Sequence, residues 1–368
     1  MTVGFHSPLP PARSGVADYA AALLAELRRW TDVRVATEQA DLHLYHVGNN
    51  SLHQHIYRRA LRTPGVVVLH DAVLHHFFLG ALNQHAYVQE MMYNYGAWVR
   101  DLAIRLFERR WKSAAEPLYF LFPLLRRIAE VSRALIVHNP AAAQMVRQHV
   151  PTARVFEVPH LYVAPPSCSP AAVARWRAAL GVAPGETLFG VFGYLRQTKR
   201  LPSVLRAFHR LRQITSQVKL LIAGEPSSAA VARLLDQLCR APGVIRLGYL
   251  SPAELSPCLT AADVCINLRY PSAGETSGIA IRMLGAGRAV ILTRGLENSC
   301  FPEHIAVQID SGLPEEDELL AAMYWLHEDR ARRHALGEFA RQHVATHHHI
   351  RRVAQQYWQI LQEIAHAV

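Results

Sequence analysis

The regular alternation of short apolar runs with helix-length segments is the feature of this sequence that most constrains its fold. Runs such as Val66–His70 and Ala134–His138 are almost entirely apolar, and segments long enough for a helix lie between them. Continuous apolar runs are typical of strands buried on both faces, and parallel strands need long crossovers to connect them. The sequence therefore predicts parallel sheets covered by helices.

This alternation occurs twice, once in each half of the chain. The first half contains the expected strands Val3–His6, Val33–Thr37, Leu42–Val47, Val66–His70, Ala134–His138 and Val155–Val158. The second half contains Leu188–Phe192, Val218–Ala223, Val244–Leu247, Val264–Leu268, Val290–Thr293 and Ala306–Ile309. A chain of 368 residues also exceeds what one hydrophobic core usually organises. We therefore expect an α/β protein with two Rossmann-like parallel-sheet domains that face a cleft.

The expected boundary between these domains is the stretch Ala164–Pro170, where prolines and serines interrupt the apolar pattern. It separates a first domain, residues 1–163, from a second domain, residues 164–345. Within the first domain, residues 72–131 show helical spacing, which predicts an insertion of two or three helices. Residues 346–368 are expected to form a terminal helix.

Composition excludes several other classes of protein. The chain is 51% hydrophobic and 18% charged, which is typical of a globular protein and not of a disordered one. No run approaches the roughly 18 apolar residues of a membrane-spanning helix. Met1–Phe5 lacks the features of a secretion signal, so a cytoplasmic protein is expected. The five cysteines contain no CxxC pair, which favours ordinary buried thiols over disulfides or a zinc site.

The net charge of +10 indicates an anionic partner. Phosphates and an anionic membrane surface both fit a diffuse positive charge. Nucleic acid does not, because no basic run is interleaved with stacking aromatic residues. The segment Phe107–Arg127 suggests a peripheral contact at the inner membrane face, because cations flank the apolar run Leu118–Leu125. The alternative, which we favour slightly, is that this run packs against the first domain.

The strongest candidate site is the loop Pro271–Ile279, which follows an expected strand. It combines the carboxylate of Glu275 with the hydroxyls of Thr276 and Ser277, and Gly278 stands where a helix begins. Unpaired amides at a helix start favour a diphosphate, and glycine lets the backbone approach it. We expect Glu275 to accept hydrogen bonds from sugar hydroxyls. Thr276 or Ser277 caps the helix in either case.

A second candidate site is the turn Gly193–Arg200, which also follows an expected strand. Three cations, Arg196, Lys199 and Arg200, lie there just before a helix. One interpretation is a solvated basic turn. The other is a clamp on a leaving phosphate, because cations placed where negative charge develops lower the barrier to bond cleavage.

Polar residues also follow several strands of the first domain. Ser14 and Gly15 open the first helix and leave room for a ligand at its amides. A His–Asp pair at a strand end can bind substrate or orient a proton transfer. Polar helix positions and a metal site are the alternative interpretations of these histidines. The residues concerned are Gly48, Asn49, Asn50 and His53 in one loop, and His70, Asp71, His75 and His76 in the next.

Together these motifs resemble those of a GT-B glycosyltransferase of glycosyltransferase family 4, the retaining enzymes that use nucleotide diphosphate sugars. In that family a Gly-Arg-Leu-x-x-x-Lys-Gly turn supplies Arg and Lys to the donor diphosphate. Gly193, Leu195 and Lys199 match this turn. Tyr194 replaces the family's Arg, with Arg196 close by as a substitute, and Arg200 replaces the last Gly.

The family's Glu-x7-Glu element begins in a turn like that at Glu275. Its first Glu contacts the transferred sugar and its second binds the nucleotide ribose. The second position in this chain is Met283, whose thioether is a weak hydrogen-bond acceptor without charge. The nucleotide is therefore open, and dTDP-sugars are candidates alongside UDP- and GDP-sugars.

The resemblance also implies roles for the first domain. Ser14 and Gly15 would touch the donor phosphates or the acceptor, and His70 would lie beside the reacting sugar with Asp71. Asn49 and His53 would belong to the acceptor side. The terminal helix, with Tyr357 and Trp358, is expected to cross back to the first domain.

The activity implied is transfer of a hexosyl group with retention, with no metal and no cofactor beyond the nucleotide sugar as substrate. The acceptor is open and ranges from a glycan or lipid-linked glycan to a protein or small molecule. Two alternatives stay open at this stage. One is a nucleotide-sugar epimerase or hydrolase on the same fold. The other is a catalytically silent sugar-nucleotide-binding protein, which Tyr194 and Met283 make plausible.

Overall fold

The computed structural model describes residues 1–12 and 14–366, so Arg13 and the last two residues of the expected terminal helix lie outside the described residues. The chain divides into two compact units. Unit 1 comprises Met1–Val163, Pro271–Thr276 and His347–Val368, and unit 2 comprises Ala164–Tyr270 and Ser277–Thr346. The loop Pro271–Thr276, which the sequence assigns to the second domain, therefore belongs to unit 1.

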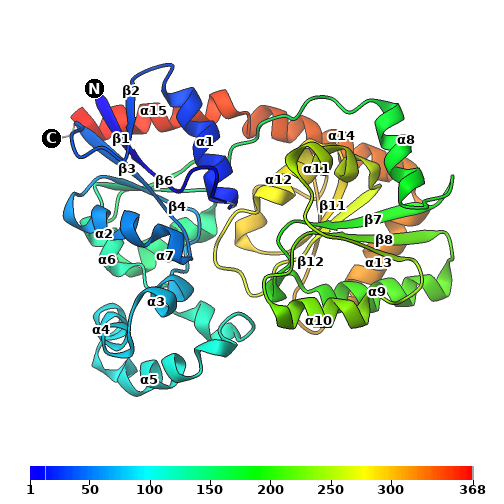
Figure 1. The fold of residues 1–368 in the computed structure, drawn as a ribbon, viewed down its shortest axis with the longest axis horizontal. Coiled ribbons are helices and arrows are strands. Elements are labelled where there is room, and N and C mark those ends of the chain that lie inside the picture. The colour runs from blue at the N-terminus through cyan, green and yellow to red at the C-terminus, as the bar shows by residue number, and fades with distance from the viewer. Residues whose placement is uncertain (13, 367–368) are drawn as a thin grey trace. The chain divides into compact units, whose positions relative to one another are not determined.

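Unit 1 is built on a six-stranded parallel sheet of order β2-β1-β3-β4-β5-β6 (Figure 1). Its central strands are buried on both faces, as their apolar runs predict. The strands are β1 (Thr2–His6), β2 (Asp32–Val35), β3 (Leu42–Val47), β4 (Val66–Leu69), β5 (Ala134–Val137) and β6 (Val155–Glu157).

The helices of unit 1 cover this sheet and form the insertion that the sequence predicts. They are α1 (Gly15–Leu27), α2 (Gln54–Arg62), α3 (His75–Ala81), α4 (Gln84–Tyr95), α5 (Arg100–Glu108), α6 (Arg126–Val131), α7 (Pro140–His149) and α15 (Ile350–His366). The insertion holds four α-helices, α3 to α6, where two or three were expected, because Asn83 begins α4 directly after the end of α3 and Gly96 ends α4. Within the expected apolar run, Tyr119, Leu124 and Leu125 are fully buried in the core of unit 1.

Helix α15 returns to unit 1, as predicted, and lies along α1 (Figure 1). Its apolar face, with Val353, Leu361 and Ile364, joins the core on that side of the sheet. The phenol oxygens of Tyr19 and Tyr357 are 2.9 Å apart and form a buried hydrogen bond between the two helices. The end of the chain is thus part of the first Rossmann-like unit.

Unit 2 contains a second six-stranded parallel sheet, of order β12-β11-β10-β7-β8-β9. Its strands are β7 (Thr187–Phe192), β8 (Val218–Ala223), β9 (Val244–Leu247), β10 (Val264–Asn267), β11 (Ala289–Thr293) and β12 (Val307–Ile309). Its helices are α8 (Pro170–Ala179), α9 (Leu201–Ile214), α10 (Ala229–Leu238), α11 (Pro252–Ala261), α12 (Gly278–Gly285), α13 (Glu315–Glu328) and α14 (Arg330–His347). Counted from its own first strand, the order is 3-2-1-4-5-6, that of the dinucleotide-binding Rossmann fold.

Each sheet has a point at which the strand order reverses. In unit 1 this point lies between β1 and β3, and in unit 2 it lies between β7 and β10. Ligands of open α/β sheets bind beyond the carboxyl ends of the strands at such points. The loops that follow these four strands are therefore the places to look for a site. In the part of the chain that the structure describes, no helix is both long and apolar enough to cross a membrane.

Candidate functional site

The amino end of α12 and the turn after β7 lie together at the reversal point of unit 2. Ser277 is the N-cap of α12, and its Oγ accepts a hydrogen bond from Ala280 N at 3.3 Å. Gly193 has a φ of +91°, and a Cβ added to it would lie 3.5 Å from the Ile279 side chain. Glycine therefore meets both the conformation and the close approach to α12 at this position.

Lys199 is buried within unit 2, with only 4% of its surface exposed. Its Nζ donates hydrogen bonds to the Phe192 carbonyl at 2.8 Å and to Asn267 Oδ1 at 3.1 Å. The side-chain nitrogen of Asn267, Nδ2, donates a hydrogen bond to Ser277 Oγ at 3.1 Å. A buried ammonium is thus connected through one amide to the cap of α12.

The other two cations of this turn differ in their surroundings. Arg196 is exposed, and its guanidinium lies 5.3 Å from the centre of the Tyr194 ring. Arg200 forms an ion pair with Glu315 in which Nε donates to both carboxylate oxygens, at 2.8 and 3.1 Å. Arg200 also has a φ of +55°, so it adopts the left-handed conformation that suits the glycine of the family's turn.

The loop Pro271–Thr276 carries Glu275 and is held by the polypeptide of unit 1. The Ala273 carbonyl accepts hydrogen bonds from the amides of Ala72 and Val73, at 2.8 and 3.0 Å. Glu275 Oε2 accepts a hydrogen bond from Ala273 N at 2.8 Å, within the loop itself. The half-buried carboxylate of Glu275 and the residues that follow His70 and Asp71 are therefore parts of the same unit.

The polar residues after β3 and β4 form one hydrogen-bonded network in unit 1. Asp71 Oδ2 accepts a hydrogen bond from the backbone N–H of Asn49 at 2.8 Å. The side-chain oxygen of Asn49, Oδ1, accepts one from the backbone N–H of Phe77, also at 2.8 Å. The Asn49 side-chain amide lies 3.1 Å from His76 Nδ1. The structure thus brings Asn49 and Asp71 together and fixes them to the start of α3.

His70 and His53 are buried beside this network. His70 Nε2 lies 2.9 Å from Nδ1 of His46, and burial holds the pKa of both imidazoles well below the usual range. His53 Nδ1 donates to the His46 carbonyl at 2.9 Å, and burial lowers the pKa of His53 to about 4. A Cβ at Gly48 would lie 2.8 Å from His53 Nε2, so glycine keeps this side of the ring open. Both histidines are neutral at pH 7 and suited to hydrogen bonding.

The remaining predicted residues lie at the start of α1 or are buried on α12. Ser14 is the N-cap of α1, where its Oγ accepts from Ala17 N at 3.1 Å, and nothing lies within 4 Å of where a Cβ of Gly15 would be. Met283 is fully buried on α12 and presents no exposed surface to a ribose. Among the described residues, no group of three or more His, Cys, Asp or Glu side chains is arranged to hold a metal ion.

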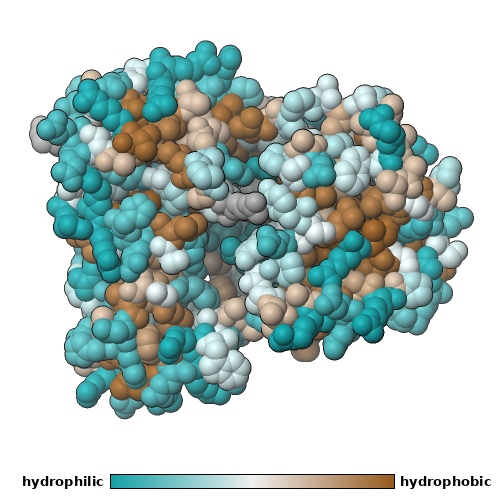
Figure 2. All heavy atoms as spheres, in the orientation of Figure 1, coloured by the Kyte–Doolittle hydropathy of each residue, from teal (hydrophilic) through white to brown (hydrophobic). Residues whose placement is uncertain are grey.

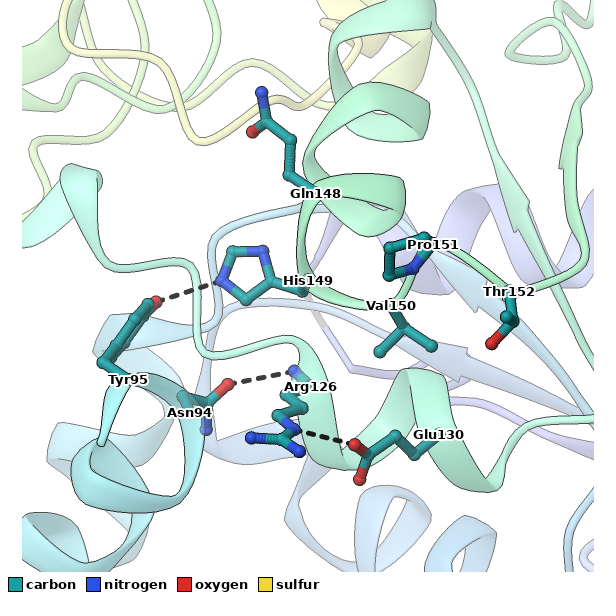
Figure 3. A pocket seen from close by; sticks show the side chains of 9 residues that line it. All are labelled: Asn94, Tyr95, Arg126, Glu130, Gln148, His149, Val150, Pro151 and Thr152. Carbon is teal, nitrogen blue, oxygen red and sulfur yellow. Dashed lines mark hydrogen bonds and ion pairs between the residues drawn. The ribbon is translucent and has the colours of Figure 1, made fainter. Parts of the chain in front are cut away.

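A separate hollow of about 480 Å³ lies in unit 1 but contains none of these residues (Figure 3). Its polar side chains largely bind one another. Tyr95 Oη lies 3.2 Å from His149 Nε2, and Arg126 Nε lies 2.7 Å from Glu130 Oε1. The hollow is therefore not the site that the motifs indicate.

Three buried polar residues at the site were missed by sequence reasoning. His46 contacts His70, Asn267 contacts Lys199, and Asn139 contacts the loop that carries Glu275. The signal available for each was a polar residue within or directly after an apolar strand. Such a residue needs a buried partner, because an unpaired polar group inside a protein is costly.

Comparison with known proteins agrees with the observed fold. Both units are Rossmann-like, and the chain has the fold of GT-B glycosyltransferases. Residues 186–329 match the family model described as Glycosyl transferases group 1. Unit 2 therefore carries a glycosyl transferases group 1 domain.

The similar structures cover almost the whole chain at low sequence identity. Sucrose-phosphate synthase from Thermosynechococcus elongatus has a TM-score of 0.70 and 15% identity, with 100% of both chains covered. HepE from Anabaena, solved in complex with UDP-glucose, has a TM-score of 0.70 and 16% identity, with 99% of this chain and 100% of that one covered. At such identities the likeness establishes the fold.

A curated relative is similar over part of the chain. The D-inositol 3-phosphate glycosyltransferase of Mycobacterium sp. (strain JLS) is 29% identical over 171 residues. This match covers 45% of the present chain and 37% of the relative, so it spans little more than a third of the relative's length.

Proposed function

We propose that this protein is a glycosyltransferase that takes its donor from a nucleotide diphosphate sugar. One observation carries the proposal. At the reversal point of a glycosyl transferases group 1 domain, the amino end of α12 is coupled through Asn267 to the buried ammonium of Lys199. A helix start and a fixed cation together favour a diphosphate.

In this proposal the donor lies against unit 2. The α12 amides from Gly278 onward, the charge of Lys199 and the exposed Arg196 neutralise the departing diphosphate. Such groups stabilise a leaving group most when they are already fixed in place, because the reaction then needs little reorganisation. Glu275 accepts hydrogen bonds from the transferred sugar.

Unit 1 supplies the acceptor side. Neutral His70 and the network of Asn49 and Asp71 bind the acceptor hydroxyl. We further propose that transfer proceeds with retention and without a metal ion. Support for both comes from the resemblance of the Gly193–Lys199 and Glu275 motifs to those of retaining, nucleotide-sugar-dependent enzymes.

The first test measures thermal stabilisation of the protein by UDP, GDP, dTDP and ADP sugars, since a ligand stabilises the state that binds it. The second follows a radiolabelled donor with and without candidate acceptors. Transfer only with acceptor supports the proposal. Release of free sugar or epimerised donor without acceptor supports the hydrolase or epimerase alternative. Binding without turnover under any condition supports the silent binding protein.

We also propose a peripheral contact between the insertion of unit 1 and an anionic membrane. Trp98 and Trp111 are 71% and 77% exposed, and Lys112 Nζ lies 4.9 Å from the centre of the Trp111 ring. Figure 2 shows hydrophobic side chains among hydrophilic ones over the region of α4 and α5. Tryptophan suits the interface between lipid and water, and each cation near an anionic surface adds about 1 kcal/mol.

Flotation with vesicles of neutral lipid, with and without phosphatidylserine, tests this contact. We expect the protein to float with the anionic vesicles and the double variant Trp98→Ser/Trp111→Ser to float several-fold less. Trp325→Ser, which changes an exposed tryptophan on α13 of unit 2, is the matched control. Flotation that does not depend on phosphatidylserine contradicts the contact.

A further inference from the structure

Asn139 connects the start of α7 to the loop Pro271–Thr276 through a side chain that is only 3% exposed. Its Oδ1 accepts a hydrogen bond from Ala142 N at 2.9 Å, which caps α7. Its Nδ2 donates to the Gly274 carbonyl at 2.9 Å and to Thr276 Oγ1 at 3.0 Å. The backbone N–H of Ala142 can bond only to the amide oxygen, so the orientation of this amide is determined by its partners.

Other contacts hold the same loop against unit 1. The two backbone amides that bind the Ala273 carbonyl belong to Ala72 and Val73, directly after Asp71. Thr276 Oγ1 also lies 3.3 Å from the His138 carbonyl, to which it donates. The loop is thus fixed on both sides of Glu275.

Close packing at Gly274 indicates that the loop position is specific. Gly274 has a φ of +69°, and a Cβ added to it would lie 3.0 Å from Ala72 Cβ and 3.1 Å from Met145 Sδ. A side chain at this position would have to displace Ala72 or Met145, so the backbone of the loop lies close to both.

We infer that Asn139 is a positioning residue that fixes the loop carrying Glu275. Glu275 lies between Gly274 and Thr276, whose oxygen atoms accept hydrogen bonds from Asn139 Nδ2. The Asn139 side chain therefore fixes the position of the backbone that carries the Glu275 carboxylate. The Ala72 and Val73 amides anchor the same loop to the turn of His70 and Asp71. The inference rests on the proposed function in one respect, namely that Glu275 contacts the sugar of the donor.

The variant Asn139→Asp tests this inference, because it separates the two bonding sides of the amide. The carboxylate retains an oxygen to cap α7 and places a second oxygen against the Gly274 carbonyl, where a donor is needed. The matched control is Asn83→Asp on α4, whose Oδ1 caps that helix by accepting from Ala86 N at 2.9 Å. Asn83 is exposed and distant from the loop in sequence.

Affinity for the sugar part of the donor is the first readout. UDP-glucose and UDP are the starting probes, replaced by the best nucleotide sugar of the thermal panel and its diphosphate if UDP-glucose does not bind. We expect Asn139→Asp to weaken the nucleotide sugar about tenfold, or 1.4 kcal/mol, and the nucleotide diphosphate less than about twofold. Asn83→Asp should change neither affinity. Equal weakening of both ligands, or of neither, overturns the inference.

Hydrogen exchange of the loop is the second readout and does not depend on any ligand. The amides of Ala273 and Gly274 are bonded within the loop, to Glu275 Oε2 and Ser272 Oγ. Asn139→Asp should speed their exchange about tenfold or more, with no such change in Asn83→Asp. Unchanged exchange overturns the inference. If the wild type binds no nucleotide sugar while exchange responds as expected, the proposed function fails and the loop anchor stands.

Discussion

At the scale of single residues, Lys199 combines a charge with a structural position. Its ammonium is buried and bonded to the Phe192 carbonyl and to Asn267. A buried ammonium is costly unless it is bonded, so these oxygens stabilise the charge where a diphosphate is proposed to leave. The same bonds make Lys199 part of the core of unit 2.

We therefore predict that Lys199→Ala lowers both turnover and stability. Turnover should fall roughly a hundredfold, as expected for loss of a fixed charge at the leaving group. The free energy of unfolding should fall by about 1–3 kcal/mol, since two buried acceptors lose their donor. Enzyme kinetics with the labelled donor and urea unfolding measure the two effects. Normal turnover in Lys199→Ala would remove this residue from the phosphate clamp.

Gly274 is a second residue at which a single added atom, the Cβ of alanine, is expected to lower stability. We predict that Gly274→Ala destabilises unit 1 by about 1–2 kcal/mol, because its φ is positive and the added Cβ meets Ala72 and Met145. Binding of the nucleotide sugar should weaken with it. The control is Gly80→Ala on α3, where nothing lies within 4 Å and alanine should stabilise by about 0.5–1 kcal/mol. Similar melting temperatures for the two variants would contradict the prediction.

At the scale of secondary-structure elements, an ion pair joins the start of α9 to α13. Arg200 precedes α9 in a left-handed conformation, and its partner Glu315 begins α13 and is only 1% exposed. Arginine is an unusual choice for this conformation. The charge-assisted hydrogen bonds from Nε to Glu315 offset part of the conformational cost.

This arrangement predicts that the effect of Glu315→Gln on the free energy of unfolding changes sign when Arg200 is replaced. Arg200→Gly suits the backbone but leaves a buried carboxylate unpaired, so it should lower the free energy of unfolding by about 3 kcal/mol. Adding Glu315→Gln should restore most of that loss, because the unpaired charge is removed. Urea unfolding of the four proteins of this double-mutant cycle gives the coupling energy. Additive effects of the two substitutions would show that the pair has no coupling.

At the scale of the whole molecule, buried histidines are concentrated in unit 1. Among the described residues, burial lowers the pKa of His6, His43, His46, His53, His70, His75, His138, His149 and His348, all of which belong to unit 1. For His53, His138 and His348 the pKa falls to about 4. The unfolded chain binds protons at these residues near pH 6.5, whereas the folded chain does not.

The unfolding transition of unit 1 should consequently be sensitive to acid. Between about pH 4 and 6.5 the unfolded state binds more protons, so stability is full above that range and is lost as the pH falls through it. Each of these three histidines removes up to about 3 kcal/mol over the range. Urea unfolding at pH 7, 6 and 5 measures the slope.

A substitution identifies the source of this slope. His138 Nδ1 donates to the Val158 carbonyl at 3.0 Å, so His138→Asn retains a donor there while removing the titration. We expect a shallower dependence on pH in this variant. Exposed His85→Gln on α4 is the control and should leave the slope unchanged. A slope that is the same in all three proteins would assign the acid sensitivity to other groups.

The strands and the loops of interest were predictable from the sequence alone. All twelve expected strands are present, with ends that differ by at most two residues, because runs such as Val218–Ala223 are defined by local patterns of apolar residues. The predicted loops after β1, β3, β7 and β10 lie at the two reversal points, because parallel strands carry their following loops at one edge. The resemblance of the turn at Gly193 to the family turn was also recognisable from the sequence, because its residues lie close together in the chain.

The tertiary structure alone decided where these loops are held and what surrounds their side chains. The loop of Glu275 belongs to unit 1 because Asn139, Ala72 and Val73 bind it, although it is 135 residues from Asn139 in sequence. Burial of Lys199 against Asn267 and pairing of His70 with His46 likewise depend on residues that only folding brings together. Hydrogen bonds act over about 3 Å. Local sequence patterns therefore determined the elements, whereas contacts between distant segments determined the site.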